Sequence, residues 1–165
     1  MGRIKTVIAM GKSETFFVIA HNIRSLYNVG SIFRTADAFG VDKIYLTGYT
    51  GTPENVIHRQ KIAKSALGAE NFIPWEHQKS AVKLIKALQK QGAKVLALEN
   101  NVKAKSLRRA KFRFPLALVL GEETKGIPKP VLRLCDGAVE IPMLGKKESL
   151  NVAVAFGIAA YGVRG

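Results

Sequence analysis

Short apolar runs alternate along the chain with segments in which apolar residues recur every three or four positions. The continuous runs predict buried strands at residues 16–20, 43–46, 94–98, 116–120 and 138–141. The helical spacing predicts helices at residues 28–39, 58–67, 80–91, 129–135 and 149–163. Continuously apolar strands that alternate with helices are typical of an α/β domain with a mainly parallel sheet flanked by helices.

Two of the predicted helices have distinctive faces. Segment 80–91 directs Ala81, Leu84, Ile85 and Leu88 to one side, and its opposite side carries a stripe of lysines: Lys79, Lys83, Lys86 and Lys90. Segment 149–163 contains no charge and many small residues. A helix that is apolar all round is buried, so we expect this one in the core or against a second subunit.

Ligands of parallel α/β sheets bind beyond the carboxyl ends of the strands. The loops at these ends are residues 21–28, 47–57, 99–106, 121–128 and 142–149. No Gly-x-Gly-x-x-Gly follows the first strand, so a Rossmann nicotinamide site is not indicated. Gly11-Lys12-Ser13 lacks the earlier glycine of a phosphate-binding P-loop and is rejected as one.

The first of these loops leads into a helix with two polar candidates. Asn28 is placed to cap that helix. Arg34 lies one turn after Gly30, where we expect space for a sugar or phosphate. The alternative for Arg34 is an ion pair with Asp37, three residues further on.

Two later loops carry further candidates. Gly121 ends a strand and permits a close backbone approach to a planar ligand, and the acids Glu122 and Glu123 follow it in an otherwise basic chain. Ser149 is placed to cap the last helix. Asn151 is polar within an apolar helix and needs a partner, which is either local backbone or a substrate.

Together and in this order, the three loops resemble the motifs of the SpoU/TrmH family of RNA ribose 2′-O-methyltransferases, in the SPOUT superfamily. The Asn-x-Gly motif followed by Arg is similar to Asn28, Gly30 and Arg34, and the Gly-x-Glu-x-x-Gly motif to Gly121–Gly126. The Ile-Pro-Met to Ser-Leu-Asn motif is similar to residues 141–151. The resemblance begins near Phe16, so we expect a catalytic domain at 16–165 after a basic arm at 1–15.

The resemblance implies a C-terminal trefoil knot, a homodimer and S-adenosylmethionine as cofactor. It implies that the adenosine site is lined by Leu98, Gly121, Ile141, Met143 and Leu150. It implies methyl transfer to a ribose 2′-hydroxyl of tRNA or rRNA at a catalytic set of Arg34, Asn28, Glu123, Ser149 and Asn151. Arg34 is a general base in family proposals, but a guanidinium is effectively never deprotonated, so a clamp on phosphate and the developing alkoxide is physically cheaper.

The net charge of +14 points to a polyanionic partner. Ten of these charges come from residues 79–113, which hold eleven Lys or Arg and one acid. The segment is either a solvated basic surface or an RNA contact. Since few residues precede the first strand, we expect RNA to be held by Lys79, Lys83, Lys86, Lys90, Lys103, Lys105, Arg108, Arg109, Lys111 and Arg113.

The remaining composition narrows the classes of protein. The single cysteine, Cys135, fits a reducing cytoplasm, and the three histidines lack the spacing of metal ligands, so no metal is expected. No apolar stretch reaches the roughly 20 residues that span a membrane. The competing interpretation is a non-catalytic RNA-binding protein on the same scaffold.

Overall fold

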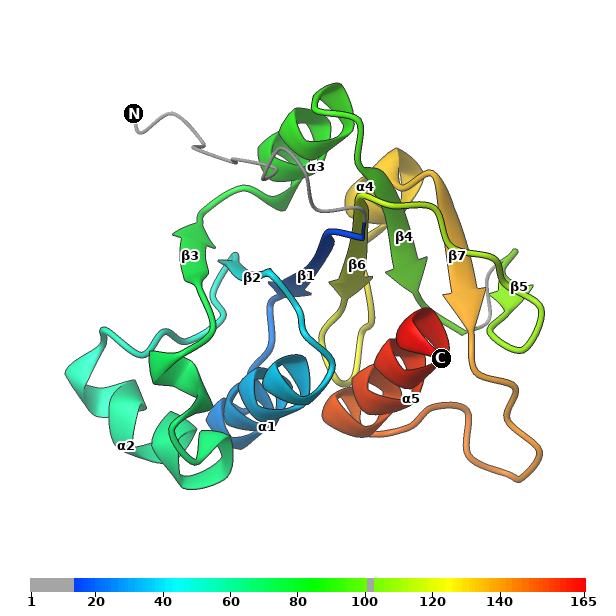
Figure 1. Ribbon diagram of the computed structural model, residues 1–165. Coiled ribbons are helices and arrows are strands. Elements are labelled where there is room, and N and C mark those ends of the chain that lie inside the picture. The colour runs from blue at the N-terminus through cyan, green and yellow to red at the C-terminus, as the bar shows by residue number, and fades with distance from the viewer. Residues whose placement is uncertain (1–13, 101–102) are drawn as a thin grey trace.

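The computed structural model describes residues 14–100 and 103–165, so most of the predicted basic arm lies outside the described residues. Within them, seven parallel strands form one sheet in the order β3-β2-β1-β6-β4-β7-β5 (Figure 1). The strands are β1 (Phe16–His21), β2 (Lys43–Thr47), β3 (Trp75–Gln78), β4 (Lys94–Leu98), β5 (Lys105–Ser106), β6 (Leu116–Leu120) and β7 (Gly137–Glu140). The predicted parallel α/β architecture is confirmed.

Helices cover both faces of this sheet (Figure 1). They are α1 (Leu26–Ala38), α2 (Val56–Ala66), α3 (Ala81–Lys90), α4 (Lys129–Leu134) and α5 (Val152–Arg164), with a 3₁₀ turn at Ala69–Asn71. Alternate residues of β1 point to opposite faces. Phe16 and Val18 pack with α1, α2 and α5, whereas Phe17 and Ile19 pack with α3 and α4. Both faces of the sheet are therefore buried, which explains why its strands are continuously apolar.

The beginnings of two helices differ from the prediction. Helix α1 starts at Leu26, and Ser25 caps it by accepting from the Asn28 backbone N–H at 3.2 Å. Helix α5 starts at Val152, and its cap is Asn151, which accepts from the amides of Ala153 and Val154. The assignments of Asn28 and Ser149 as caps were therefore wrong, because another cap-competent residue lies nearby in each case.

Helix α5 is not buried on every side in this chain. Phe156 and Ala160 are buried against the sheet and α1, whereas Val154, Ile158 and Tyr161 are exposed on the other side. Burial of the whole helix in the core of its own chain is therefore wrong, since Val154 and Ile158 are exposed and the exposed Tyr161 contacts the Phe39 ring edge-to-face. Burial against a second subunit stays a prediction.

Helix α3 has the predicted amphipathic arrangement. Ala81, Leu84, Ile85 and Leu88 are buried, and the four lysines of the stripe are exposed. In the described part of the chain, no helix is both long and apolar enough to cross a membrane.

Candidate functional site

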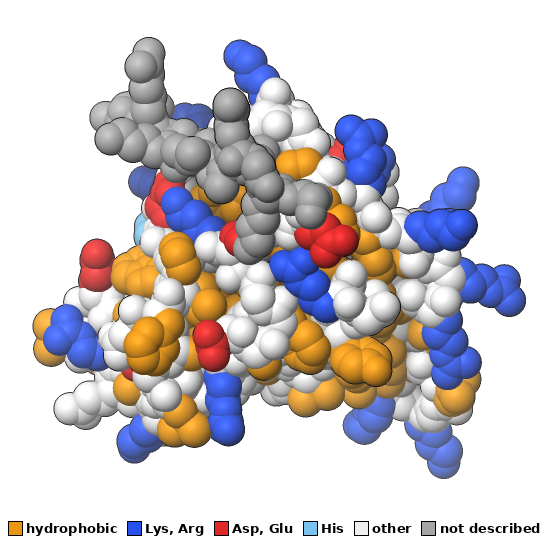
Figure 2. Space-filling view, in the orientation of Figure 1, with side chains coloured by type: hydrophobic (Ala, Val, Ile, Leu, Met, Phe, Trp, Pro, Cys, Tyr) orange, Lys and Arg blue, Asp and Glu red, His pale blue; other side chains and the backbone are white. Residues whose placement is uncertain are grey.

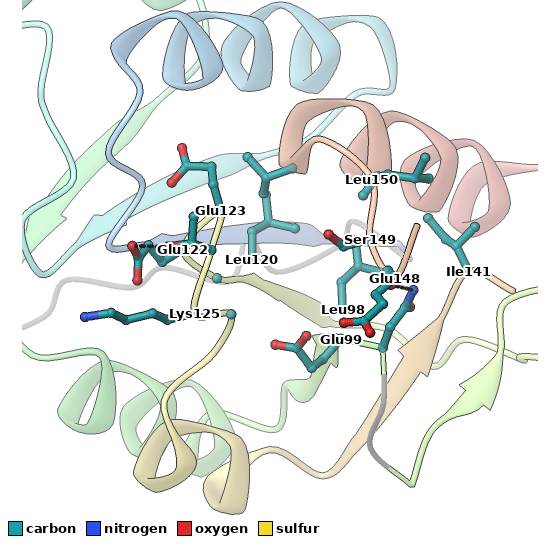
Figure 3. Close-up of a pocket in the computed structure, with 16 residues that line it drawn as sticks. Leu98, Glu99, Leu120, Glu122, Glu123, Lys125, Ile141, Glu148, Ser149 and Leu150 are labelled. Carbon is teal, nitrogen blue, oxygen red and sulfur yellow. Dashed lines mark hydrogen bonds between the residues drawn. The ribbon is translucent and has the colours of Figure 1, made fainter. Parts of the chain in front are cut away.

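A pocket of about 310 Å³ lies at the carboxyl edge of the sheet, where the chain leaves β4, β6 and β7. Residues Leu120–Gly126 form one wall, and Glu148, Ser149 and Ile141 lie across from them (Figure 3). Its volume falls in the range of small-molecule sites. The lining residues are Leu98, Glu99, Asn100, Leu120–Gly126, Ile141, Glu148–Leu150, Val152 and Ala155.

Four of the five predicted cofactor residues line this pocket, namely Leu98, Gly121, Ile141 and Leu150. The fifth, Met143, lines an adjoining hollow of about 420 Å³ instead. Of the predicted catalytic set, Glu123 and Ser149 line the pocket, whereas Asn28, Arg34 and Asn151 are not among its lining residues. Three loops that are distant in the sequence therefore converge here.

The side chains of Glu123, Asn28 and Asn151 form a chain of hydrogen bonds across the three motifs. Asn28 Nδ2 donates to Glu123 Oε1 at 3.1 Å, and Asn28 Oδ1 accepts from Asn151 Nδ2 at 3.1 Å. Because Asn151 also caps α5, this network connects the beginnings of α1 and α5 to the pocket wall. Asn28 and Asn151 thus fit positioning roles. Of the two partners expected for Asn151, the local backbone is observed, and the Asn28 side chain of the first motif is a further one.

Glu123 also holds the backbone at the beginning of α1. Its carboxylate accepts from the amides of Arg24 at 3.2 Å and Ser25 at 3.1 Å. Partial burial acts to raise the pKa of Glu123, but the hydrogen bonds from Asn28 and the backbone amides outweigh it, and the pKa lies below its usual value. Glu123 is therefore an ionised acceptor at neutral pH.

The neighbouring acid has a different partner. Glu122 is buried, and its carboxylate lies 3.5 Å from the exposed guanidinium of Arg24 and accepts from the Thr124 hydroxyl. Two adjacent acids in a basic chain are thus explained, since both tie the 121–126 loop to other groups.

Two motif glycines serve packing. A Cβ on Gly30 would lie 2.1 Å from Ser65 Oγ and 2.2 Å from the Ile62 carbonyl oxygen, so Gly30 allows α2 to pack closely against α1. The prediction that Gly30 leaves space for a sugar or phosphate is wrong, because α2 occupies that space. A Cβ on Gly121 would meet the backbone of Gly126 and Ile127 at 2.5 and 2.6 Å, so the approach here is by the loop itself.

Arg34 is exposed on α1, outside the pocket. No ion pair joins it to Asp37 or to another described residue, so the alternative of a local pair is not observed. Ser149 is exposed as well, and its hydroxyl makes no hydrogen bond to the described residues. Both side chains are free to meet a ligand.

Sequence reasoning missed three charged residues of the pocket, Glu99, Lys125 and Glu148. Their position directly after β4 and β6, or in the loop after β7, was the available signal. Glu99 Oε2 accepts from the Ile127 amide at 2.8 Å, so it braces the 121–126 loop. Four carboxylates thus line a pocket in a strongly basic protein.

All ten basic residues proposed for RNA are exposed. The stripe of α3 lies on the face of the sheet opposite α1, and segment 103–113 lies at the edge formed by β5. Figure 2 shows Lys and Arg side chains projecting along the side on which β5 and β7 lie. Within the described residues, no cluster of three or more His, Cys, Asp or Glu could hold a metal ion.

The fold and the pocket define an α/β domain with a small-molecule site built from three loops at the carboxyl edge of a parallel sheet. The model of the SpoU rRNA Methylase family matches residues 15–161. The chain belongs to this family, which confirms the resemblance seen in the sequence.

Solved structures and curated proteins are similar to this chain. The 23S rRNA (guanosine-2′-O-)-methyltransferase RlmB of Ralstonia nicotianae is 31% identical over 144 residues, which is 87% of this chain and 56% of that protein. An AdoMet-bound rRNA methyltransferase from Sinorhizobium meliloti has a TM-score of 0.80 at 27% identity, over 90% of this chain and 55% of that one.

A third similar structure, described as "Structural insights into the 2-OH methylation of C/U34 on tRNA", has a TM-score of 0.79 at 30% identity. It covers 91% of this chain and 94% of that chain. By contrast, the chain spans less than three fifths of the length of the first curated relatives it matches.

Proposed function

We propose that this chain is an S-adenosylmethionine-dependent RNA methyltransferase that acts on a ribose 2′-hydroxyl, with residues 16–165 as its catalytic domain. The observation that carries the proposal is the convergence of all three family motifs: two line one pocket, and the Asn28 hydrogen bonds join the first to it. RlmB of Ralstonia nicotianae and the tRNA 2-OH methylation structure support the choice of a ribose hydroxyl.

The pocket residues fit S-adenosylmethionine. Leu98, Ile141 and Leu150 offer apolar contact to an adenosine, and the carboxylates on the wall suit a positively charged ligand. The AdoMet-bound relative from Sinorhizobium meliloti supports this assignment. The cofactor, when bound, supplies an electrophilic methyl group on a good leaving group, so much of the rate depends on positioning.

Arg34 is the residue we assign to the RNA substrate. Its exposed guanidinium suits a phosphate next to the target ribose, where it would also stabilise the developing alkoxide. Because Arg34 lies outside the pocket of its own chain, it is better placed to act at the pocket of a second subunit. Ser149, with a free hydroxyl at the pocket, would help to orient the ribose.

A homodimer accounts for two features of the surface. The exposed Val154, Ile158 and Tyr161 of α5 form an apolar face beside small residues, which a second copy of the chain would bury. The second feature is the exposed Arg34, which does not line the pocket of its own chain and would act at the partner's.

The proposal includes the trefoil knot of the family. The chain leaves β7, forms the 141–151 loop on the pocket and continues into α5, which packs against α1. A Cβ on Gly162 of α5 would lie 3.2 Å from the Leu107 side chain, so α5 also lies against the connection between β5 and β6. This course past an earlier connection supports a threaded C-terminus.

A methyl-transfer assay tests the function directly. The protein is incubated with total RNA and tritiated-methyl cofactor, and nucleoside mass spectrometry then locates the label on ribose or base. A 2′-O-methylated nucleoside is the expected product. A methylated base would overturn the ribose assignment, and RNA binding without transfer would favour the non-catalytic RNA-binding protein.

A further inference from the structure

We propose that Tyr49, Val56 and Ile57 form a nucleobase platform that holds unpaired RNA nucleotides next to the target nucleotide. These residues belong to the connection between β2 and the first turn of α2, and we call them the β2–α2 platform. The inference rests on the proposed function and names a contact surface for its RNA substrate.

The platform is unusually exposed for its composition. Tyr49 is 57% exposed, and Val56 and Ile57 are each 79% exposed. The conformation of this segment is fixed by local hydrogen bonds, which keep these side chains at the surface. Asn55 caps α2, and Arg59 Nε donates to the Pro53 carbonyl at 3.1 Å. Three exposed large apolar side chains within nine residues of the chain are candidates for one contact surface.

The loops place this platform beside the pocket. Tyr49 N donates to Asn22 Oδ1 at 3.1 Å, and the Ile23 amide donates to Thr50 Oγ1 at 2.9 Å, so the β2–α2 connection is tied to the loop after β1. That loop is in turn tied to Glu123 through the amides of Arg24 and Ser25.

The order of strands gives the scale of this arrangement. Only β1 separates β2 from β6, so the two strand ends lie about 10 Å apart at the usual strand spacing. The pocket therefore lies between the platform on one side and the basic segment 103–113 at the β5 edge on the other (Figure 1).

Charge favours RNA as the occupant. The Arg24 side chain, which pairs with Glu122 at the pocket, is 68% exposed, and Arg59 of α2 is exposed as well. Aromatic and apolar groups interleaved with arginine are the typical contacts of unpaired bases, which stack on them while cations hold the phosphates.

The basic segment 79–113 differs from the platform because it offers exposed cations, and none of its described residues has an exposed large apolar side chain. It can therefore hold phosphates without contacting bases, and such contacts give affinity without base choice. The two surfaces divide RNA recognition between base stacking and phosphate binding.

The test compares binding of a single-stranded RNA of about ten nucleotides with binding of a duplex of the same sequence. Tyr49→Ala is expected to weaken single-strand binding about tenfold, as loss of one stacked base does, and to leave duplex binding within about twofold. Tyr49→Phe should retain the affinity, since the ring remains. Phe72→Ala removes another exposed aromatic beyond the far end of α2 and serves as the matched control.

Salt dependence separates the two surfaces. The slope of log affinity against log salt should not change in Tyr49→Ala, whereas Lys86→Ala should reduce it by about one. Equal single-strand affinity of Tyr49→Ala and the native chain would overturn the platform. So would dissociation of a dimer by Tyr49→Ala in sedimentation, which would make this surface a contact between subunits.

The failure of the proposed function is distinguishable from that of the platform. A native chain that neither transfers methyl groups nor binds any RNA contradicts the function, and the platform falls with it. A native chain that methylates RNA, with a Tyr49→Ala variant that binds it equally well, contradicts the platform alone.

Discussion

Asn151 Nδ2 donates to Asn28 Oδ1 across 3.1 Å, although 123 positions separate the two residues in the chain. Asn28 passes the connection to Glu123 on the pocket wall, and Asn151 caps the helix that carries the exposed apolar face. The pocket wall, α1 and α5 are thus linked by two asparagine side chains, and changes at either should reach both helices.

We predict that Asn151→Ala lowers the free energy of unfolding by about 1–2 kcal/mol, since it removes a helix cap and the bond to Asn28. Urea denaturation measures the change as a shift in midpoint. Ser149→Ala is the matched control and should change stability by less than about 0.5 kcal/mol, because Ser149 caps nothing.

The asparagine pair itself can be measured by a double-mutant cycle. The combined variant Asn28→Ala/Asn151→Ala should be less destabilised than the two single losses added together, by about 0.5–1 kcal/mol. Strict additivity would mean that the two side chains do not interact in solution.

Gly30→Ala is predicted to destabilise the fold by about 1–3 kcal/mol, because the added methyl would overlap Ser65 Oγ and the Ile62 carbonyl where α1 and α2 cross. Thermal unfolding detects it as a lowered Tm. Gly145→Ala, at a position with open space around the new methyl, should have little effect. A Gly30→Ala variant as stable as the native chain would show that Gly30 is not a packing glycine.

The central strands could be predicted because both faces of β1 and β6 are buried, so every residue there is apolar except His21 at the end of β1. The edge strands β3 and β5 were missed because partial exposure allows polar residues such as Glu76 and His77. The helix caps were misassigned because Ser25 and Asn28 are both suitable residue types, and local sequence does not rank them.

The sequence motifs predicted which loops form the site. Its loops follow directly from the strand ends, which meet at one edge of a parallel sheet. The role of Glu123 could not be predicted, because it depends on the backbone amides of Arg24 and Ser25, which lie almost a hundred residues away in the chain. The packing role of Gly30 likewise requires knowledge of where α2 crosses.

We predict that the buried imidazole of His21 lowers the free energy of unfolding in mild acid. Burial lowers the pKa of this imidazole, whose Nδ1 lies 2.8 Å from Thr47 Oγ1, below the usual value of 6.5. Below pH 6.5 the unfolded chain therefore binds a proton at this position more readily than the folded chain, so the free energy of unfolding decreases as pH falls. Well above pH 6.5 both states are neutral and His21 contributes no pH dependence.

The measurement compares the native chain with His21→Gln by urea denaturation between pH 7.5 and about 5. The native chain should lose stability more steeply over this range, because glutamine keeps a polar group near Thr47 and does not titrate. Parallel profiles for the two proteins would show that His21 does not set the acid sensitivity.

Arg34→Ala is expected to reduce methyl transfer by at least about a hundredfold, because the variant loses the charge proposed to stabilise the alkoxide and to hold the phosphate. Cofactor affinity in calorimetry should stay near that of the native chain, since Arg34 does not line its own pocket. Arg133→Ala removes an exposed arginine from α4, on the opposite face of the sheet, and should leave both quantities unchanged.

Mixing Arg34→Ala with a Leu150→Arg variant, whose pocket is blocked, tests whether subunits share a site. Mixed dimers should recover part of the activity if Arg34 acts at the partner's pocket. If mixed dimers, confirmed by sedimentation, show no activity, Arg34 acts at the pocket of its own subunit and not at the partner's.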